Sequence, residues 1–252
     1  YEHWYQLVNT NLGRKLLLDS LMQENHVCFD TETTSLNALN TELVGIAFSW
    51  APGKGYYLSM PENRDDVILI LQPFKKFFEN SKIEKIGHNL KFDLKVLKQY
   101  GINVKGPLFD TMIAHYLINP DMRHSMDVLA KTYLNYNSQP ISDLIGKKGK
   151  DQKNMRDIPL HDQTEYAVED TDITLQLKYH FEKEMEIAGT YKLFKELELP
   201  LVQVLTEMEC EGINLDTSFL KTLSKKLLED IEALEKRIYL TAGENFNMKS
   251  NK

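Results

Sequence analysis

The sequence predicts an α/β protein, with a mixed β-sheet flanked by helices and an α-helical segment at the C-terminal end. Strand-like runs at 26–31, 42–50 and 56–60 follow one another closely, with Pro-Gly between the last two, which favours an antiparallel meander. Helical and strand patterns then alternate as far as residue 118, as in sheets covered by helices. From residue 191 onward only helical periodicity remains.

The remaining elements follow from spacing and from stop signals such as Gly101 and Pro120. We expect a lead-in over 5–22, of which the latter part is weakly helical. Further helices are expected over 65–79, 90–100, 111–118, 126–134 with Ser125 as its cap, 161–187, 193–211 and 217–242. Short strands are expected over 83–87 and 104–109. Residues 137–160 lack any period and predict a long loop with a short helix at most.

Length and charge limit the possible functions. A chain of 252 residues suits one large domain, or one domain with an appendage. A net charge of −7 excludes a basic coat for gripping duplex DNA, but allows a nuclease with an acidic metal site. The change of character near residue 190 predicts one domain over 1–190 and a second segment over 191–252.

Cysteine content and hydropathy bear on the compartment. Two cysteines do not make a disulfide framework, and no long apolar run or signal peptide is apparent, so we expect a soluble, cytoplasmic monomer without a membrane partner. The chain starts with Tyr1 rather than methionine and ends without an obvious terminating element, which suggests a piece of a longer protein.

The first polar cluster, Asp30-Thr31-Glu32, follows the buried run Val27-Cys28-Phe29. Because side chains alternate along a strand, Asp30 and Glu32 are expected on the same face. Two neighbouring carboxylates repel unless a divalent metal or a shared proton lies between them. A solvated strand end is the simpler alternative for this motif alone.

Two further clusters place acids on helices. Asn89 and Asp93 are four residues apart, as are Tyr166 and Asp170, so each pair is expected to share a helix face. Taken singly, Asp93 could be an acid favoured by a helix N-terminus, and Asp170 could pair with a lysine. Together, the four acids Asp30, Glu32, Asp93 and Asp170 can converge at one sheet edge, where two divalent cations would offset their repulsion.

These clusters resemble the three exonuclease motifs of the DEDD superfamily, and most closely the 3′→5′ proofreading domain of bacterial, family A, DNA polymerase I. The resemblance rests on FDTETTSL (29–36), GHNLKFDLKVL (87–97), FDTMIAHYLINP (109–120), MDVLAKTYL (126–134) and YAVEDTDITLQL (166–177). It implies a ribonuclease H-like fold. Residues 196–216 and 242–252 resemble the opening of the polymerase domain, which would make 191–252 the truncated start of its thumb.

The resemblance also implies roles for particular residues. Asp30, Glu32, Asp93 and Asp170 match the ligands of two metal ions, Mg²⁺ or Mn²⁺, and Tyr166 matches the tyrosine that orients the attacking water. Glu165 stands where a second branch of the superfamily has histidine, so this chain belongs to the tyrosine branch. The substrate-contacting positions of the family fall on Thr33, Leu36, Asn89, Phe92 and Arg123.

The implied reaction is hydrolysis of the 3′-terminal phosphodiester of single-stranded or frayed DNA, which releases 5′-mononucleotides. An exoribonuclease of the same superfamily and a non-catalytic scaffold for a polymerase are the alternatives. No stretch resembles the catalytic acids of a polymerase palm, so we expect no polymerase activity.

A basic stretch precedes the last motif, and it allows two interpretations. One is a solvated loop; the other is that two or three of its side chains contact phosphates of the strand. Its members are Lys147, Lys148, Lys150, Lys153 and Arg156.

Overall fold

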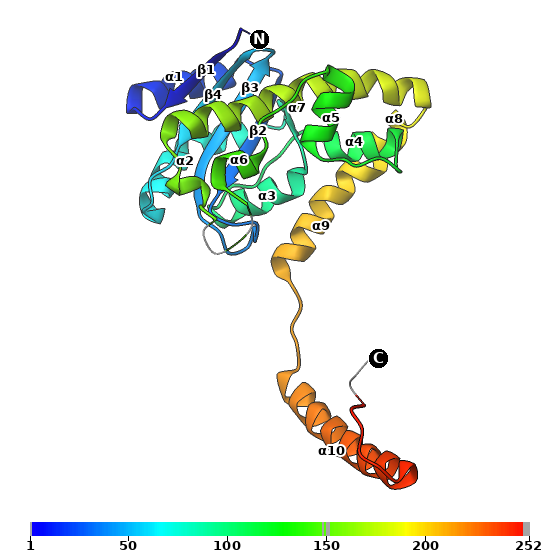
Figure 1. The fold of residues 1–252 in the computed structure, drawn as a ribbon. Coiled ribbons are helices and arrows are strands. Elements are labelled where there is room, and N and C mark those ends of the chain that lie inside the picture. The colour runs from blue at the N-terminus through cyan, green and yellow to red at the C-terminus, as the bar shows by residue number, and fades with distance from the viewer. Residues whose placement is uncertain (1, 148, 150–151, 249–252) are drawn as a thin grey trace. The chain divides into compact units, whose positions relative to one another are not determined.

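The computed structural model describes residues 2–147, 149 and 152–248, and Figure 1 shows its fold. By their internal contacts, the residues fall into the compact units Tyr1–Cys210 and Glu211–Lys252, which are treated separately here.

Within the described residues, the first unit is built on a six-stranded sheet in the order β1-β4-β3-β2-β5-β6 (Figure 1). The strands are β1 Trp4–Val8, β2 His26–Thr33, β3 Leu43–Ala51, β4 Lys54–Ser59, β5 Glu84–Gly87 and β6 Leu108–Asp110. Strand β3 is antiparallel to β2 and β4, whereas the β1–β4, β2–β5 and β5–β6 pairs are parallel. The predicted meander and mixed sheet are therefore confirmed.

Helices cover both faces of this sheet. They are α1 Asn11–Leu21, α2 Arg64–Phe78, α3 Leu90–Gln99, α4 Thr111–Ile118, α5 Met126–Leu134, α6 Ile141–Ile145, α7 Leu160–Ala188, α8 Tyr191–Leu193 and α9 Leu199–Glu211. Two short helical segments complete the described part of the unit. One is the 3₁₀ turn η1 Met155–Asp157, which is wound more tightly than an α-helix, and the other is the wider π-helical turn η2 Phe194–Glu198.

The alternation of β2 separates two hydrophobic cores. Val27 and Phe29 pack with residues of α1, α2 and α3, whereas Cys28 packs with residues of α4, α5 and α7. Helix α7 also crosses β3 and β4, and Gly55 permits this close approach, since a Cβ atom there would lie 2.2 Å from Cγ1 of Val168. The long helix that carries the last acidic motif is thus held against the sheet.

The latter part of the expected lead-in over 5–22 is helical as expected, as α1, but the structure corrects its first part. Residues Trp4–Val8 form a strand that pairs in parallel with β4 at the sheet edge. Its five residues are too few for a reliable period-2 signal, and its partner lies some fifty residues away. The strand expected over 104–109 is shorter, because Gly106 at φ 93° and Pro107 precede its first residue, Leu108.

The helix expected over 193–211 is interrupted. Pro200 lacks an N–H group, and its ring would clash with the carbonyl of Glu196 in a regular helix. The π-helical turn η2, Phe194–Glu198, widens the helix at this point. The loop over 137–160 holds only α6 and η1 as helical turns within its described part.

The division of contacts falls after Cys210 rather than near residue 190. Helix α9 belongs to the first unit, because Val202 and Thr206 are buried there and Glu209 pairs with two lysines of α3. The change in composition at 190 therefore does not coincide with the division of contacts.

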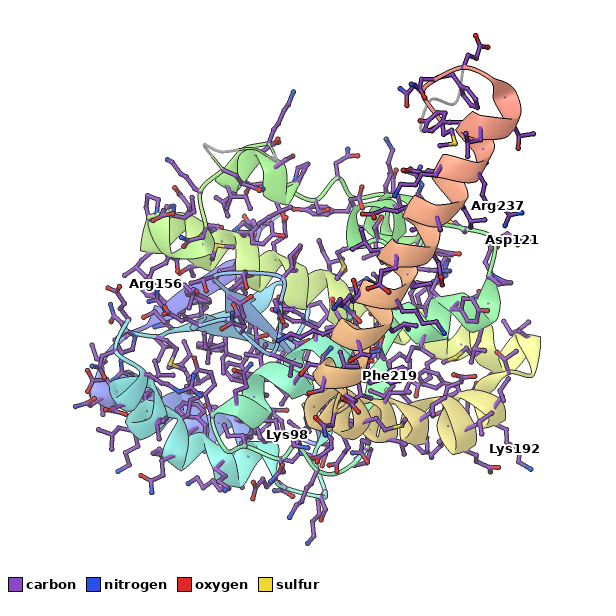
Figure 2. All side chains as sticks on the ribbon, turned by 90° about the horizontal axis from the view of Figure 1, so that it is seen from below. Lys98, Asp121, Arg156, Lys192, Phe219 and Arg237 are labelled. Carbon is purple, nitrogen blue, oxygen red and sulfur yellow. The ribbon has the colours of Figure 1, made fainter. Side chains whose placement is uncertain are left out.

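The second unit consists mainly of helix α10, Thr217–Ala242, along which Phe219 lies near the start and Arg237 near the end (Figure 2). None of its described side chains is buried within the unit. Exposed apolar residues recur every three or four positions along it, at Leu220, Leu223, Leu227, Ile231, Leu234 and Ile238. Such a stripe is typical of a helix face that packs against further protein.

Candidate active site

Two of the predicted acids lie near the carboxyl end of β2. Asp30 and Glu32 lie on one side of this strand, and the pairing with β3 shifts register between Glu32 and Thr33. Only 8% of Glu32 is exposed. The irregular end of the strand directs Thr33 and the following loop toward the same cleft.

Asp93 reaches this place from helix α3 on the other side of β2. It is 1% exposed, and its Oδ1 atom accepts hydrogen bonds from the backbone N–H of Thr31, at 3.0 Å, and from the Thr31 hydroxyl, at 2.5 Å. A residue between the two acids of β2 therefore binds the third acid. This contact fixes helix α3 against the strand.

Asn89 does not share a helix face with Asp93 as expected, because it precedes the helix in a left-handed conformation at φ 63°. The buried carboxylate of Asp110 holds this turn: it accepts from the N–H groups of Asn89, at 3.2 Å, and Leu90, at 2.8 Å. Asp110 also caps α4 through the N–H groups of Met112 and Ile113. Sequence analysis missed this residue, although an Asp between a strand and a helix is a known N-cap signal.

Tyr166 and Asp170 lie one turn apart on α7, as expected, and both line the cleft. The ring of Tyr166 packs against a small apolar cluster of Val44, Met155 and Ile158. This cluster joins the loop before α7 to the sheet, so that the loop helps to place the tyrosine.

The cleft formed by these elements has a volume of about 700 Å³. It brings together the predicted residues Asp30, Glu32, Asp93, Tyr166 and Asp170, together with Thr33, Leu36, Asn89 and Phe92. Leu36 is 95% exposed on the loop after β2. Arg123 is not among the lining residues and is exposed between α4 and α5.

The acids interact strongly, with Asp30 at their centre. Burial raises the pKa of Asp30 from 3.8 to about 7, although the Thr31 N–H opposes this shift. Burial and then the charge of Asp30 raise the pKa values of Glu32, Asp93 and Asp170 well above their ordinary range. Burial followed by the charge of Asp170 also raises the pKa of Tyr166. Without cations, these groups therefore tend to hold protons.

The donor set fits hard divalent cations. Its side-chain donors are carboxylate oxygens, which suit Mg²⁺ and Mn²⁺, and their mutual repulsion would be relieved by positive charge. As the side chains stand, no three His, Cys, Asp or Glu groups of the described chain form a ready coordination shell. Asp93 is turned toward Thr31, which donates to its Oδ1 atom.

His88 and a stretch before α7 also line the cleft. His88 contacts the Thr111 hydroxyl through Nδ1 at 2.9 Å, and burial lowers its pKa to about 4. The stretch before α7 contributes Gln152, Lys153, Asn154 and Met155. We refer to residues 152–155 as the cleft wall.

The basic stretch divides according to what its members contact. Lys153 is exposed and lines the cleft, and Lys147 is also exposed. Lys148 and Lys150 lie outside the described residues. Arg156 binds protein groups at the ends of β3 and β4, so that it is not a free cation for phosphates.

Comparison with known proteins agrees with this picture. A profile described as 3′-5′ exonuclease matches residues 5–186. DNA polymerase I of Borreliella burgdorferi is 38% identical over 253 aligned residues, which cover 98% of this chain and 27% of that protein. The chain thus spans about a quarter of the length of the curated relatives that it matches.

Solved structures share the fold. The polymerase domain of Pol1 from M. smegmatis, in complex with DNA primer-template and dNTP, has a TM-score of 0.78 and 19% identity over 97% of this chain and 39% of that one. Brucella melitensis NrnC with bound Mg²⁺ has a TM-score of 0.64 and 21% identity over 86% of this chain and 99% of that one.

The mixed sheet covered by helices is a ribonuclease H-like fold, and the predicted acids gather at the carboxyl end of its strand β2. The chain belongs to the 3′-5′ exonuclease family, in the form found in DNA polymerase I homologues. Its residues 5–186 correspond to the 3′-5′ exonuclease domain of that family. In the part of the chain that the structure describes, no helix is long and apolar enough to cross a membrane.

Proposed function

We propose that this domain removes 5′-mononucleotides from the 3′ end of single-stranded or frayed DNA, and that it is the proofreading part of a DNA polymerase I. The observation that carries the proposal is the convergence of four carboxylates and Tyr166 from β2, α3 and α7 in one cleft. Burial and mutual repulsion raise the pKa values of these carboxylates, so crowding them together destabilises the fold when they are ionised. A purely structural role does not explain such an arrangement.

In this proposal, Asp30, Glu32, Asp93 and Asp170 hold two divalent ions, Mg²⁺ or Mn²⁺. When bound, these cations supply the positive charge that activates water and stabilises the charge developing on the phosphate. Besides burial, the charge of Asp30 raises the pKa of each of the other three acids, and Asp30 would help to hold both ions. Thr31 occupies only the Oδ1 atom of Asp93, which leaves the Oδ2 atom for this purpose.

The other residues orient the reactants. The Tyr166 hydroxyl and the Glu32 carboxylate orient the attacking water toward the terminal phosphate. This role requires both side chains to be positioned precisely. Leu36, almost fully exposed on its loop, wedges against the terminal base, and Thr33, Asn89 and Phe92 contact the last nucleotides. Arg123 lies outside the cleft and would contact the strand farther from the scissile bond.

The C-terminal part supports a link to a polymerase. We propose that residues 191–252 are the helical start of a polymerase thumb, with the exposed apolar stripe of α10 packing against the rest of that domain. The protein would act in the cytoplasm as a monomer, with a single-stranded 3′ end and the covalently linked polymerase domain as its partners.

An exoribonuclease of the same superfamily would use the same acids, and a scaffold would use none of them. The test is to incubate the protein and Mg²⁺ with 5′-labelled DNA and RNA oligomers of the same sequence, and to identify the released products by chromatography. We expect stepwise shortening of DNA from the 3′ end with release of 5′-mononucleotides. Faster loss of RNA would favour the exoribonuclease, and loss of neither would favour the scaffold.

A further inference from the structure

The cleft wall, residues 152–155, lies against the side of the site that carries Tyr166. Met155 is 3% exposed and belongs to the apolar cluster on which the Tyr166 ring packs. The Lys153 N–H donates to the carbonyl of Ile145 at 2.9 Å, which joins the wall to α6. A shift of the wall would therefore move both a cleft surface and the support of Tyr166.

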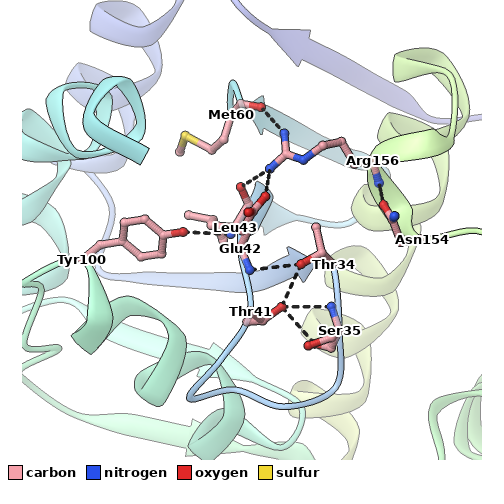
Figure 3. A network of polar contacts seen from close by, with 9 residues as sticks. All are labelled: Thr34, Ser35, Thr41, Glu42, Leu43, Met60, Tyr100, Asn154 and Arg156. Carbon is pink, nitrogen blue, oxygen red and sulfur yellow. Dashed lines mark hydrogen bonds and ion pairs between the residues drawn. The ribbon is translucent and has the colours of Figure 1, made fainter. Parts of the chain in front are cut away.

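The wall is anchored through the next residue, Arg156 (Figure 3). Its Nη2 atom donates to the carbonyl of Leu43 at 3.2 Å and lies 3.6 Å from the Glu42 carboxylate. Its Nη1 atom makes a longer contact of 3.5 Å with the carbonyl of Met60. The guanidinium thus binds the start of β3 and the residue after β4.

Glu42, which Arg156 contacts, also holds the loop after β2 that carries Leu36 and lines the cleft. The Glu42 N–H donates to the Thr34 hydroxyl at 3.1 Å, and the Thr34 N–H donates to the Glu42 carbonyl at 3.0 Å. The Thr41 hydroxyl accepts from the Ser35 N–H at 2.9 Å (Figure 3). These bonds close the loop that presents Leu36, so that Glu42–Leu43 lies between the two sides of the cleft.

A planar guanidinium suits this place better than another cation would. Two carbonyl groups on neighbouring strands need donors in a fixed fork, whereas a lysine ammonium is a single point of attachment. The Arg156 Nε atom is shielded from water without a hydrogen-bond partner among the described residues, which costs free energy that a solvated position avoids. A role only in solubility does not account for that burial.

We infer that Arg156 is a positioning residue for the exonuclease site: it fixes the cleft wall relative to Tyr166 and to the loop that carries Leu36. The inference rests on the proposed function for the identity of the reaction, but the anchoring itself does not depend on it. This role differs from that of Lys153, which lines the cleft itself.

The test compares Arg156→Met, Arg156→Lys and Glu42→Gln with Lys192→Gln, a change at an 82% exposed side chain. For Arg156→Met we expect a drop of about 10-fold in kcat/KM on a single-stranded DNA oligomer, because small misplacements in a site have large effects. Arg156→Lys should recover part of it. Glu42→Gln should change it less than about 2-fold, since Glu42 is 59% exposed and such pairs contribute little.

Hydrogen exchange supplies a readout that does not require activity. The amides of residues 153–158 should exchange faster in Arg156→Met, while those of β2 and β3 stay protected, and the Lys192→Gln variant should match the wild type. Faster exchange with kcat/KM within 2-fold of the wild type would overturn the positioning role. Unchanged exchange would overturn the anchor.

Two complications remain separable. If the wild type hydrolyses no DNA, the proposed function fails, and the exchange data alone decide whether Arg156 anchors the wall. If Arg156→Met does not fold, Arg156→Lys carries the test, because it keeps the charge and one donor: exchange and kcat/KM both equal to the wild type would then overturn the inference.

Discussion

At the scale of single residues, Asp30 dominates the electrostatics of the site. After burial, its charge is the next cause that raises the pKa values of Glu32, Asp93 and Asp170, and it lies on the strand between the helices that carry the last two. No other acid of the cleft acts on all three. A metal site that uses these carboxylates therefore depends on Asp30 more than on any other group.

We expect Asp30→Asn and Asp170→Asn each to lower DNA hydrolysis by at least ~10³-fold, since each removes a ligand charge worth several kcal/mol in the transition state. Initial rates on a labelled oligomer with saturating Mg²⁺ measure this. Asp19→Asn, an exposed change on α1, is the control and should leave the rate unaltered. A tenth of the wild-type rate remaining in either variant would contradict the two-metal assignment.

Tyr166→Phe should be milder. In the proposed mechanism the hydroxyl orients a water but carries no metal charge, so we expect a loss of ~10–10²-fold in kcat. The ring should still pack on Met155 and Val44, so that the melting temperature changes little. Tyr116→Phe, at a ring that is 53% exposed, is the matched control. An unchanged kcat in Tyr166→Phe would remove the role proposed for the hydroxyl.

The residues that could be predicted from the sequence are those with a local pattern. Asp30 and Glu32 follow from strand alternation, and Tyr166 and Asp170 from helical spacing, and all four line the cleft. The left-handed Asn89 could not be foreseen, because its conformation depends on Asp110, some twenty residues later. Arg156 was grouped with the lysines, since its partners belong to strands more than ninety residues earlier.

At the scale of elements, the start of α3 rests on the buried carboxylate of Asp110. It accepts from four backbone N–H groups: those of Asn89 and Leu90 at the N-terminal end of α3, and two in the first turn of α4. One side chain thus fixes two helices relative to β6. Because α3 carries Phe92 and Asp93, this contact also sets the geometry of the cleft.

For Asp110→Ala we expect a loss of roughly 2–4 kcal/mol of stability, from a lost helix cap and from buried N–H groups left without acceptors. In a domain of this size, that corresponds to roughly 5–15 °C in melting temperature. Calorimetry measures it. Asp127→Ala is the control, because Asp127 is an exposed acid in the first turn of α5 and should change stability by less than about 0.5 kcal/mol. Equal melting temperatures for the two variants would contradict this account.

Elements were predictable where their period was long or their ends were marked. Helix α4 begins and ends as expected, and α10 does so too, because both have clear stop signals. Strand β1 was missed, since five residues at a sheet edge have little pattern of their own and their pairing with β4 is a tertiary property. The π-helical turn η2 follows from Pro200 in retrospect, but a proline alone does not distinguish a kink from a wider turn.

At the scale of the whole molecule, the end of the first unit determines which piece can fold alone. Phe194 is 1% exposed and packs edge-on against Phe109 at 4.9 Å, and Val202 is 4% exposed. We expect a chain ending at residue 210 to keep the melting temperature of the first unit. A chain ending at 190 should lose roughly 3–5 kcal/mol, the value of burying these two side chains. Equal thermal stability of the two pieces would place the boundary near residue 190 instead.

The pH dependence of stability offers a test that joins the site to the whole fold. The folded pKa of Asp30, about 7, lies above its ordinary value of 3.8. Between these two values the folded protein keeps a proton that the unfolded chain has released. The stabilisation due to this proton is complete below about pH 4 and is lost as the pH rises through 7.

In EDTA, the wild type should therefore lose melting temperature relative to Asp30→Asn as the pH is raised from 5 to 8, because the variant has no charge to gain at that position. Mg²⁺ at pH 8 should increase the free energy of unfolding of the wild type by RT ln(1 + [L]/Kd), where [L] is the free Mg²⁺ concentration, and so raise its melting temperature. The melting temperature of the variant should rise much less. Scanning calorimetry of both proteins at pH 5, 6.5 and 8, with and without Mg²⁺, measures the two effects together. Parallel pH curves for wild type and variant in EDTA would contradict the raised pKa, and equal Mg²⁺ shifts would contradict a cation site built around Asp30.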